Sequence, residues 1–517
     1  MKREGEISLL LLRRIEEELT SLLGPAGLEA LRRRSTDPTE VGALKQQVLE
    51  ALLRRWEDIL EGLPKESGLP ALISDPEYLK RIAEVAVERI RWGPGAPTLR
   101  IEPRKLGSEE VRALLNGGIN LGLIFGAESI YFQDVVLAFQ VDEVCSRPRD
   151  GRRVNVLGVH VDWLTESGEA TRGIIVDREW RIKEVRFEEA VELHAVQTLH
   201  LPTLGEAELH RRVSRLFEEA GVLQINPYEA SERAEDKALT HRLWLRHGVG
   251  LETPSFTLIP MSSSFGDALE ALRAFIRDLA GKDGRGEVGV FIQPNRGTEG
   301  HLVERYTFKA DGKIERDHPA VRHLRAVLQL DDALLREERG NVRFLSSKDP
   351  EKGYRSISLR MNVAWDGLRF VAESGYAQVS RDSATPVASK SRGGEIIGLH
   401  EALSGLHYPS DSGWARLELT PGHLRRIGSV AEAAAEALNS GLPERLYLKM
   451  VGIDLLLEVR DGDGRLDVTP ILLEANPRPA GLNHSVSLGS LWAEPRLMVT
   501  SAVFRAVRTL LEGRIDV

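Results

Sequence analysis

Three polar residues in the C-terminal part of the chain have the types and spacing of a metal site. Asp454 lies within the apolar run 451–459, and Glu474 and Asn476 follow a second apolar run, 468–473. A turn-rich stretch separates the two runs, which predicts a β-hairpin with Asp454 beside Glu474. A carboxylate in an apolar strand is costly unless a cation or donors satisfy it, and Mg²⁺ takes oxygen ligands of these types. The three residues are the candidate metal ligands; the alternative is an acidic hairpin end without metal.

Cationic residues recur between positions 354 and 394. Arg360 lies in an apolar strand pattern, and Arg381, Lys390 and Arg392 follow, the last two beside Ser389 and a Gly-Gly pair. Four cations on strands and a glycine-rich loop favour a converging anion site, because guanidinium groups bind carboxylate and phosphate in a bidentate manner. Each residue taken alone is better explained as a salt-bridged surface side chain.

Two further stretches could bind phosphate. Residues 225–240 read as a strand end, a loop and a helix start, and this helix ends near Gly248. Lys237, at its start, either holds a phosphate or pairs with neighbouring acids. Residues 288–306 read as strand, glycine loop and strand; Gly297 and Gly300 would let backbone N–H groups approach a ligand. The stretch has neither a P-loop nor a dinucleotide-binding pattern.

Composition limits the class of protein. The chain has 517 residues, a net charge of −9 and one cysteine. This charge disfavours a general nucleic-acid-binding surface and suits a small anionic substrate held in a local basic pocket. The single cysteine excludes an intramolecular disulfide and fits a reducing compartment, so we expect a cytoplasmic protein. No export signal and no membrane span are expected, because charges interrupt every apolar run.

The pattern of elements predicts three domains in an α/β and α+β multidomain fold. Residues 1–95 show helical periodicity and form a helical N-terminal domain, which serves for packing or for a homodimer. Residues 96–228 alternate short apolar runs with helical patterns such as 108–115, as an α/β domain does. Residues 229–517 continue with strands, hairpins and helices.

Taken in order, these motifs resemble the ATP-grasp superfamily, and within it the branch of glutathione synthetase and the RimK-type carboxylate–amine ligases. The matching pieces are Asp236-Lys237, the strand and glycine loop at 290–300, the Arg360 strand, the Ser389 to Gly394 loop, and Asp454 with Glu474-Ala-Asn476-Pro. The resemblance implies a pre-ATP-grasp-like domain at 96–228 and a two-subdomain ATP-grasp fold at 229–517 with a lid at about 250–335.

The resemblance also implies roles for the site residues. ATP would contact Lys237, Gln293, Gly297 and Gly300, and two Mg²⁺ ions, with Mn²⁺ as the alternative, would bind the Asp454, Glu474 and Asn476 set. Arg360, Arg381 and Arg392 would be catalytic, and Ser389 and Arg478 would bind substrate. One departure is Gln293, which stands where the family usually has lysine, so a charge-assisted phosphate contact is missing.

The function implied is an ATP-dependent ligase that activates a carboxylate as an acyl phosphate for attack by an amine. Its partners would be small carboxylate and amine substrates, with no nucleic acid and no membrane. A kinase acting on a hydroxyl of a sugar, polyol or inositol-type molecule is the alternative, and a nucleotide-binding regulator without turnover is the third reading. Because two neighbouring carboxylates repel, Glu474→Gln is expected to leave the melting temperature of the ligand-free protein unchanged or to raise it.

Overall fold

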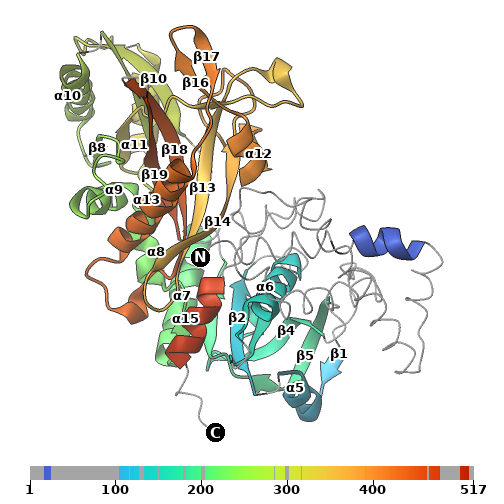
Figure 1. Ribbon diagram of the computed structural model, residues 1–517. Coiled ribbons are helices and arrows are strands. Elements are labelled where there is room, and N and C mark those ends of the chain that lie inside the picture. The colour runs from blue at the N-terminus through green and yellow to red at the C-terminus, as the bar shows by residue number, and fades with distance from the viewer. Residues whose placement is uncertain are drawn as a thin grey trace.

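The structure is a computed structural model in which three β-sheets and the helices around them are described (Figure 1). The described residues are 15, 17–24, 104–115, 117–126, 133–148, 151–177, 182–199, 204–284, 286–296, 302–315, 317–389, 392–462, 465–477 and 501–511. The expected α/β and α+β architecture is confirmed within these ranges. Most of the expected helical domain at 1–95, with Gly297, Gly300 and Arg478, lies outside them. The predicted domain boundaries stay predictions.

The first sheet is mixed and has seven strands. Four of them, β3, β2, β6 and β7 in spatial order, run parallel to one another. Its strands in spatial order are β1 (Arg104–Leu106), β5 (Ile182–Val191), β4 (Ala170–Val176), β3 (Val154–His160), β2 (Ile119–Phe125), β6 (Ala195–Thr198) and β7 (Leu223–Gln224). Strand β2 is buried along its whole length, as expected for a continuous apolar run in a parallel sheet. The associated helices are α5 (Ser108–Leu115), α6 (Gln133–Ser146), the 3-10 turn η3 (Val161–Trp163) and α7 (Leu204–Glu219).

The second sheet is antiparallel and has four strands, in the order β10 (Glu304–Lys309), β9 (Glu287–Pro294), β11 (Ala333–Glu337) and β8 (Phe256–Ile259). Helices α10 (Phe265–Asp283) and α11 (Pro319–Leu328) share a hydrophobic core with one face of it, to which Val290, Ile292 and Leu335 belong. Because side chains alternate along a strand, Phe291, Gln293 and Arg336 face the opposite side. We call this four-stranded unit the lid sheet.

The third sheet has eight strands and carries the predicted hairpin at its centre. Strand β13 pairs with β14 and also with β18, which in turn pairs with β19. Its strands are β12 (Arg343–Phe344), β13 (Arg355–Trp365), β14 (Phe370–Val379), β15 (Glu395–Gly398), β16 (Leu406–Ser410), β17 (Gly413–Arg416), β18 (Met450–Gly462) and β19 (Arg465–Asn476). We call it the central sheet, and in Figure 1 it stands between the lid sheet and the seven-stranded sheet.

Helices cover the central sheet and join it to the first sheet. They are α8 (Tyr228–Glu235), α9 (Lys237–Arg246), α12 (Leu399–Ser404), α13 (Pro421–Asn439) and α15 (Ser501–Leu511), with the 3-10 turns η4 (Pro350–Lys352) and η6 (Glu444–Leu446). The C-terminal helix α15 contacts α6 as well as β13 and β14. There the buried Arg508 guanidinium donates to Glu143 at 2.7 Å, which ties the two sheets together.

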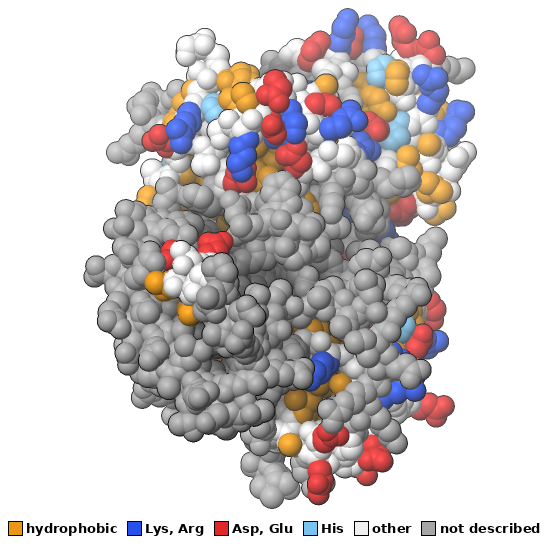
Figure 2. All heavy atoms as spheres, turned by 90° about the vertical axis from the view of Figure 1, so that its right-hand side faces the viewer, with side chains coloured by type: hydrophobic (Ala, Val, Ile, Leu, Met, Phe, Trp, Pro, Cys, Tyr) orange, Lys and Arg blue, Asp and Glu red, His pale blue; other side chains and the backbone are white. Residues whose placement is uncertain are grey.

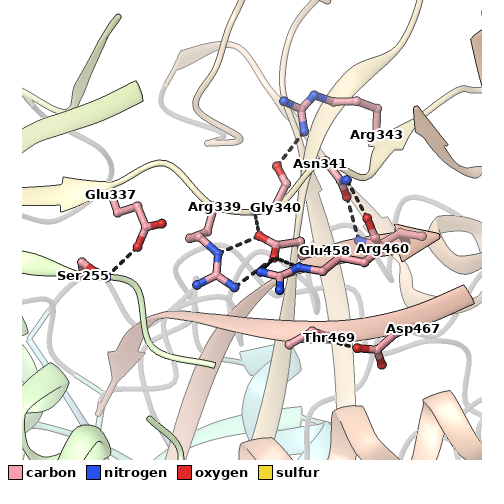
Figure 3. A network of polar contacts seen from close by, with 11 residues as sticks. Ser255, Glu337, Arg339, Gly340, Asn341, Arg343, Glu458, Arg460, Asp467 and Thr469 are labelled. Atoms are coloured by element: carbon pink, nitrogen blue, oxygen red, sulfur yellow. Dashed lines mark hydrogen bonds and ion pairs between the residues drawn. The ribbon is translucent and has the colours of Figure 1, made fainter. Parts of the chain in front are cut away.

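The chain leaves the lid sheet through residues 338–342, and β18 holds this connection firmly (Figure 3). Arg339 donates to both carboxylate oxygens of Glu458, at 2.6 and 3.0 Å. Asn341 pairs through its side chain with the backbone N–H and C=O of Val459, both at 2.8 Å. These contacts fix the point from which the lid sheet extends.

Most predicted elements are found. The strands of the hairpin, the helix at 108–115, the helix ending before Gly248 and the strands flanking the 297–301 loop are all present. One interpretation was wrong: residues between Ile225 and Asp236, read as a loop, contain helix α8, whose Ala230, Ser231 and Ala234 are buried. The helix begins directly after Pro227, whose fixed φ suits a helix start.

The described surface is mixed in charge: basic and acidic side chains are interspersed over the upper part of the view in Figure 2. Within the described ranges, no helix combines the length and apolarity needed to cross a membrane.

Candidate active site

Four side chains form one row across four neighbouring strands of the central sheet. Tyr376 in β14 pairs with Arg360 in β13, Arg360 pairs with Asp454 in β18, and Asp454 pairs with Glu474 in β19. Directly paired residues lie on the same face of a sheet, so register alone aligns these groups. The predicted juxtaposition of Asp454 and Glu474 is therefore present, and Arg360 lies directly beside it.

Arg360 and Asp454 form a buried ion pair. Arg360 donates through Nε and Nη2 to the two oxygens of Asp454, at 2.5 and 2.6 Å. Gly452 makes room for this arginine, because a Cβ there would lie 3.1 Å from the Arg360 Cδ. Burial, with the charge of Glu474, raises the pKa of Asp454 against the opposing effect of Arg360. The pKa of Arg360 is raised: burial would lower it, but the Asp454 charge outweighs that effect.

Glu474 lies among three cations. Its Oε2 is 3.8 Å from the Lys237 Nζ, and its Oε1 is 3.9 Å from the Arg360 Nη2. Desolvation would raise the pKa of Glu474, but Lys237, Arg360 and Arg336 together lower it. The carboxylate is thus kept ionised, and its side chain is 34% exposed, so an incoming ligand can reach it.

Lys237 is positioned by the start of helix α9. The Asp236 side chain caps this helix by accepting from the Leu239 N–H at 2.9 Å. Asn295, just after β9 of the lid sheet, accepts from the Ala238 N–H at 2.9 Å and donates to Asp236 at 3.0 Å. The lid sheet and the lysine-bearing helix are therefore joined at the edge of the site.

The carbonyl of Leu473, next to Glu474, collects two donors from different elements. His241 in α9 donates through Nε2 at 3.0 Å, and Arg336 in β11 donates through Nη1 at 3.4 Å. Burial lowers the pKa of His241 to about 3, with Arg336 acting in the same direction, so this imidazole is neutral. Arg336 thus reaches from the lid sheet to the border of the acidic pair.

Tyr376 closes the other end of the row. The Arg360 guanidinium lies 5.6 Å from the centre of its ring, within the range of a cation–π contact. Burial raises the pKa of Tyr376 to about 12. The phenol is therefore protonated and supports Arg360 from the side opposite Asp454.

The remaining predicted residues are placed unevenly. Gln293 is buried on the face of the lid sheet that also carries Arg336. Arg392 donates to Glu304 of β10 at 3.3 Å, and Ser389 is buried with its carbonyl accepting from the Arg392 N–H. Arg381 is 66% exposed and pairs with Asp382, so the structure does not bring it into the central row.

The donor set fits Mg²⁺ held jointly with phosphate oxygens. Among the described residues no group of three or more His, Cys, Asp or Glu side chains could hold a metal ion. Mg²⁺ is commonly bound through one or two carboxylates together with substrate phosphates, which matches Asp454 and Glu474. Asn476 donates to Asp454 at 3.4 Å through Nδ2, which leaves its amide oxygen for a cation. A carboxylate has about four lone-pair sites, so the bonds from Arg360 leave Asp454 further acceptor capacity.

Sequence reasoning missed Arg336, His241 and Tyr376. Arg336 is followed by Glu337, Glu338 and Arg339, which resembles a solvated charged stretch. His241 and Tyr376 are single residues that belong to no motif. Only strand register could have found the arginine and the tyrosine, since Tyr376 pairs with Arg360 and Arg336 is a diagonal neighbour of Gln293.

Comparison with known proteins gave matches among solved structures only: no family model and no curated protein matches the chain. The D-cycloserine synthetase DcsG is 17% identical, covering 77% of this chain and all (100%) of its own, with a TM-score of 0.38. The VanG D-Ala:D-Ser ligase from Enterococcus faecalis is 13% identical, with coverages of 77% and 100% and a TM-score of 0.41. PsnB, an ATP-grasp ligase, is 13% identical, with coverages of 77% and 98% and a TM-score of 0.36. All three TM-scores are below 0.5, so these similarities say nothing about the chemistry of the site, which depends on its own side chains.

Proposed function

We propose that the chain is an ATP-grasp enzyme, an ATP-dependent ligase that joins a carboxylate to an amine. The observation that carries this proposal is the row Arg360, Asp454 and Glu474 on the central sheet, with Lys237 of α9 beside Glu474. Phosphoryl transfer needs positioned cations and carboxylates rather than a protein nucleophile. This cluster offers both.

In the first half-reaction a substrate carboxylate oxygen attacks the γ-phosphorus of ATP. The new O–P bond forms as the bond from the γ-phosphorus to the bridging oxygen breaks, and ADP leaves with that oxygen. Lys237 and Arg360 would hold phosphate oxygens in line and stabilise the charge that develops on them. Held by Asp454, Glu474 and Asn476, Mg²⁺ would supply further charge neutralisation.

In the second half-reaction the amine nitrogen attacks the acyl carbon. The C–N bond forms, the bond from carbon to the phosphate oxygen breaks, phosphate leaves with the pair of electrons, and the amine passes its proton to solvent. Arg392, which donates to Glu304 of β10, and Ser389 would orient the acyl phosphate, as would Arg381 after a movement of its exposed side chain. A tightly packed site would exclude water from the acyl phosphate.

The test is product analysis with purified protein, Mg-ATP and pooled amino acids. A ligase of this type releases ADP and free phosphate only when both substrates are present. Release of AMP and pyrophosphate would contradict acyl phosphate formation. Phosphate retained on a hydroxyl product would instead establish the kinase alternative.

A further inference from the structure

Arg336 is a buried cation with a single hydrogen bond to the described protein. It is 7% exposed, and its hydrogen bond within the described ranges is the 3.4 Å contact with the Leu473 carbonyl. A guanidinium has five N–H donors, so most of them have no protein acceptor there. No carboxylate of the described residues lies within ion-pair distance of it. Burial accordingly lowers the pKa of Arg336 to about 10.

A second unsatisfied donor lies on the same face of the lid sheet. Gln293 is 2% exposed, and its Nε2 has no hydrogen-bond partner among the described residues. Arg336 pairs with Phe291 across β9 and β11, two residues before Gln293, so Arg336 and Gln293 are diagonal neighbours. The Arg336 guanidinium lies 5.4 Å from the Phe291 ring centre, which keeps it over this face.

The charges around Glu474 also favour an anionic ligand. Three cations, Lys237, Arg336 and Arg360, influence Glu474, while Asp454 is the other carboxylate of the cluster. Among the described residues, cations from three different elements therefore influence Glu474. A ligand with several acceptor oxygens and negative charge matches such a set, and phosphate suits a guanidinium fork.

We infer that Arg336 binds a phosphate group of the nucleotide from the lid sheet and supplies the cation that Gln293 does not provide. This inference rests on the proposed function and deepens it. The cation that binds phosphate is then Arg336 on β11, the strand that pairs with β9, and not a residue of β9 itself. Gln293 then acts as a neutral donor beside it.

The experiment measures binding of Mg-ADP and of adenosine by calorimetry to the full chain and to Arg336→Gln. Losing a charge-assisted phosphate contact weakens Mg-ADP binding about tenfold or more, while adenosine affinity stays within about twofold. The double variant Arg336→Gln/Gln293→Lys returns the charge to β9 and regains most of the Mg-ADP affinity. Arg343→Gln is the matched control, because Arg343 is a half-buried arginine that bonds only to nearby carbonyls of the lid connection among the described contacts.

The outcomes separate the two levels of the proposal. If Arg336→Gln binds Mg-ADP as tightly as the parent, or loses Mg-ADP and adenosine equally, Arg336 is a structural brace and the inference is wrong while the proposed function stands. If the parent binds neither ligand, both the inference and the proposed function fail. Should Arg336→Gln not fold, Arg336→Lys keeps a point charge and must bind Mg-ADP more weakly than the parent, with adenosine affinity unchanged; equal Mg-ADP affinity in that variant contradicts the inference.

Discussion

Arg360 and Asp454 face each other across β13 and β18 and form two hydrogen bonds of 2.5 and 2.6 Å, with side chains only 8% and 6% exposed. The pair lies at the centre of the row that runs from Tyr376 to Glu474. It therefore contributes to the fold of the central sheet as well as to the charge of the site. Its two roles can be separated by measurements of stability and of activity.

Arg360→Gln should destabilise the protein by about 3 kcal/mol, because it leaves a buried carboxylate without its cation. Asp454→Asn should cost a similar amount, and the double variant should cost less than the sum of the two. Urea unfolding of the four proteins measures this coupling. Arg460→Gln removes a largely exposed partner of Glu458 and serves as the control, with an expected change within about 1 kcal/mol. Additive losses would show that the pair is not energetically coupled.

Glu474→Gln should lower kcat about 100-fold, a loss of about 3 kcal/mol, because a negative ligand of the proposed Mg²⁺ site is removed. For the ligand-free protein, the contacts of Glu474 reverse the effect on the melting temperature that was expected from the sequence. Lys237, Arg336 and Arg360 lose a compensating charge, so the apo melting temperature should fall rather than stay or rise. Thermal unfolding with and without Mg-ATP measures both effects. A shift with Mg-ATP as large as in the parent would rule out Glu474 as a ligand.

The contrast between these two expectations shows what the sequence could predict. Two apolar runs separated by a turn predicted the hairpin and placed Asp454 beside Glu474, since both features are local. The cations around Glu474 come from α9, β11 and β13, which are far apart in the chain. Their convergence depends on register between strands, which no single stretch encodes.

Predictions from local sequence patterns also failed at other places where the structure depends on residues far apart in the chain. Arg336 lies in a charged stretch that looks solvated, yet its side chain is buried, with Nη1 on the Leu473 carbonyl of β19 and the guanidinium over the Phe291 ring of β9. The helix at Tyr228–Glu235 follows an Asn-Pro pair that is typical of a turn. There, tertiary packing of Ala230 and Ala234 decides the conformation. The central chemistry was thus visible in local patterns, and its surroundings were not.

Lys449 predicts a pH dependence of stability. Its buried Nζ donates to the carbonyls of Gln224, Arg445 and Tyr447 at 3.1, 3.1 and 3.3 Å. Burial lowers its pKa from 10.5 to about 7, with Glu444 opposing. Between these two values the unfolded chain binds a proton that the folded protein does not, so stability rises with pH from about 7 to 10.5 and falls as pH drops towards 7.

The measurement is urea unfolding of the parent and of Lys449→Met at pH 7, 8 and 9. The free energy of unfolding of the parent minus that of the variant should increase with pH by up to about 1.4 kcal/mol per unit. Taking the difference between the two proteins removes the contribution of other titrating groups. A difference independent of pH would show that Lys449 stays protonated in the folded protein.

The last prediction concerns the connection between the lid sheet and β18 (Figure 3). Glu458 accepts from Arg339 at 2.6 and 3.0 Å and from the Gly340 N–H at 3.4 Å, and these bonds lower the pKa of the partly buried Glu458 against the effect of burial. Glu458→Gln keeps the shape but removes the charge, so it should cost about 2 kcal/mol. Because Asn341 still pairs with Val459, the loss should be local.

Hydrogen exchange tests this locality. Amides of residues 339–342 should exchange faster in Glu458→Gln, while the Val459 amide, still bonded to Asn341, and those of the lid sheet keep their protection, because the lid core with α10 and α11 does not involve Glu458. Asp467→Asn removes the exposed partner of Arg426 and is the control, with an expected change within about 1 kcal/mol. Since the lid sheet carries Gln293 and Arg336, a loosened connection should also weaken Mg-ADP binding. Equal exchange at residues 339–342 in the parent and in Glu458→Gln would show that Asn341 alone holds the connection.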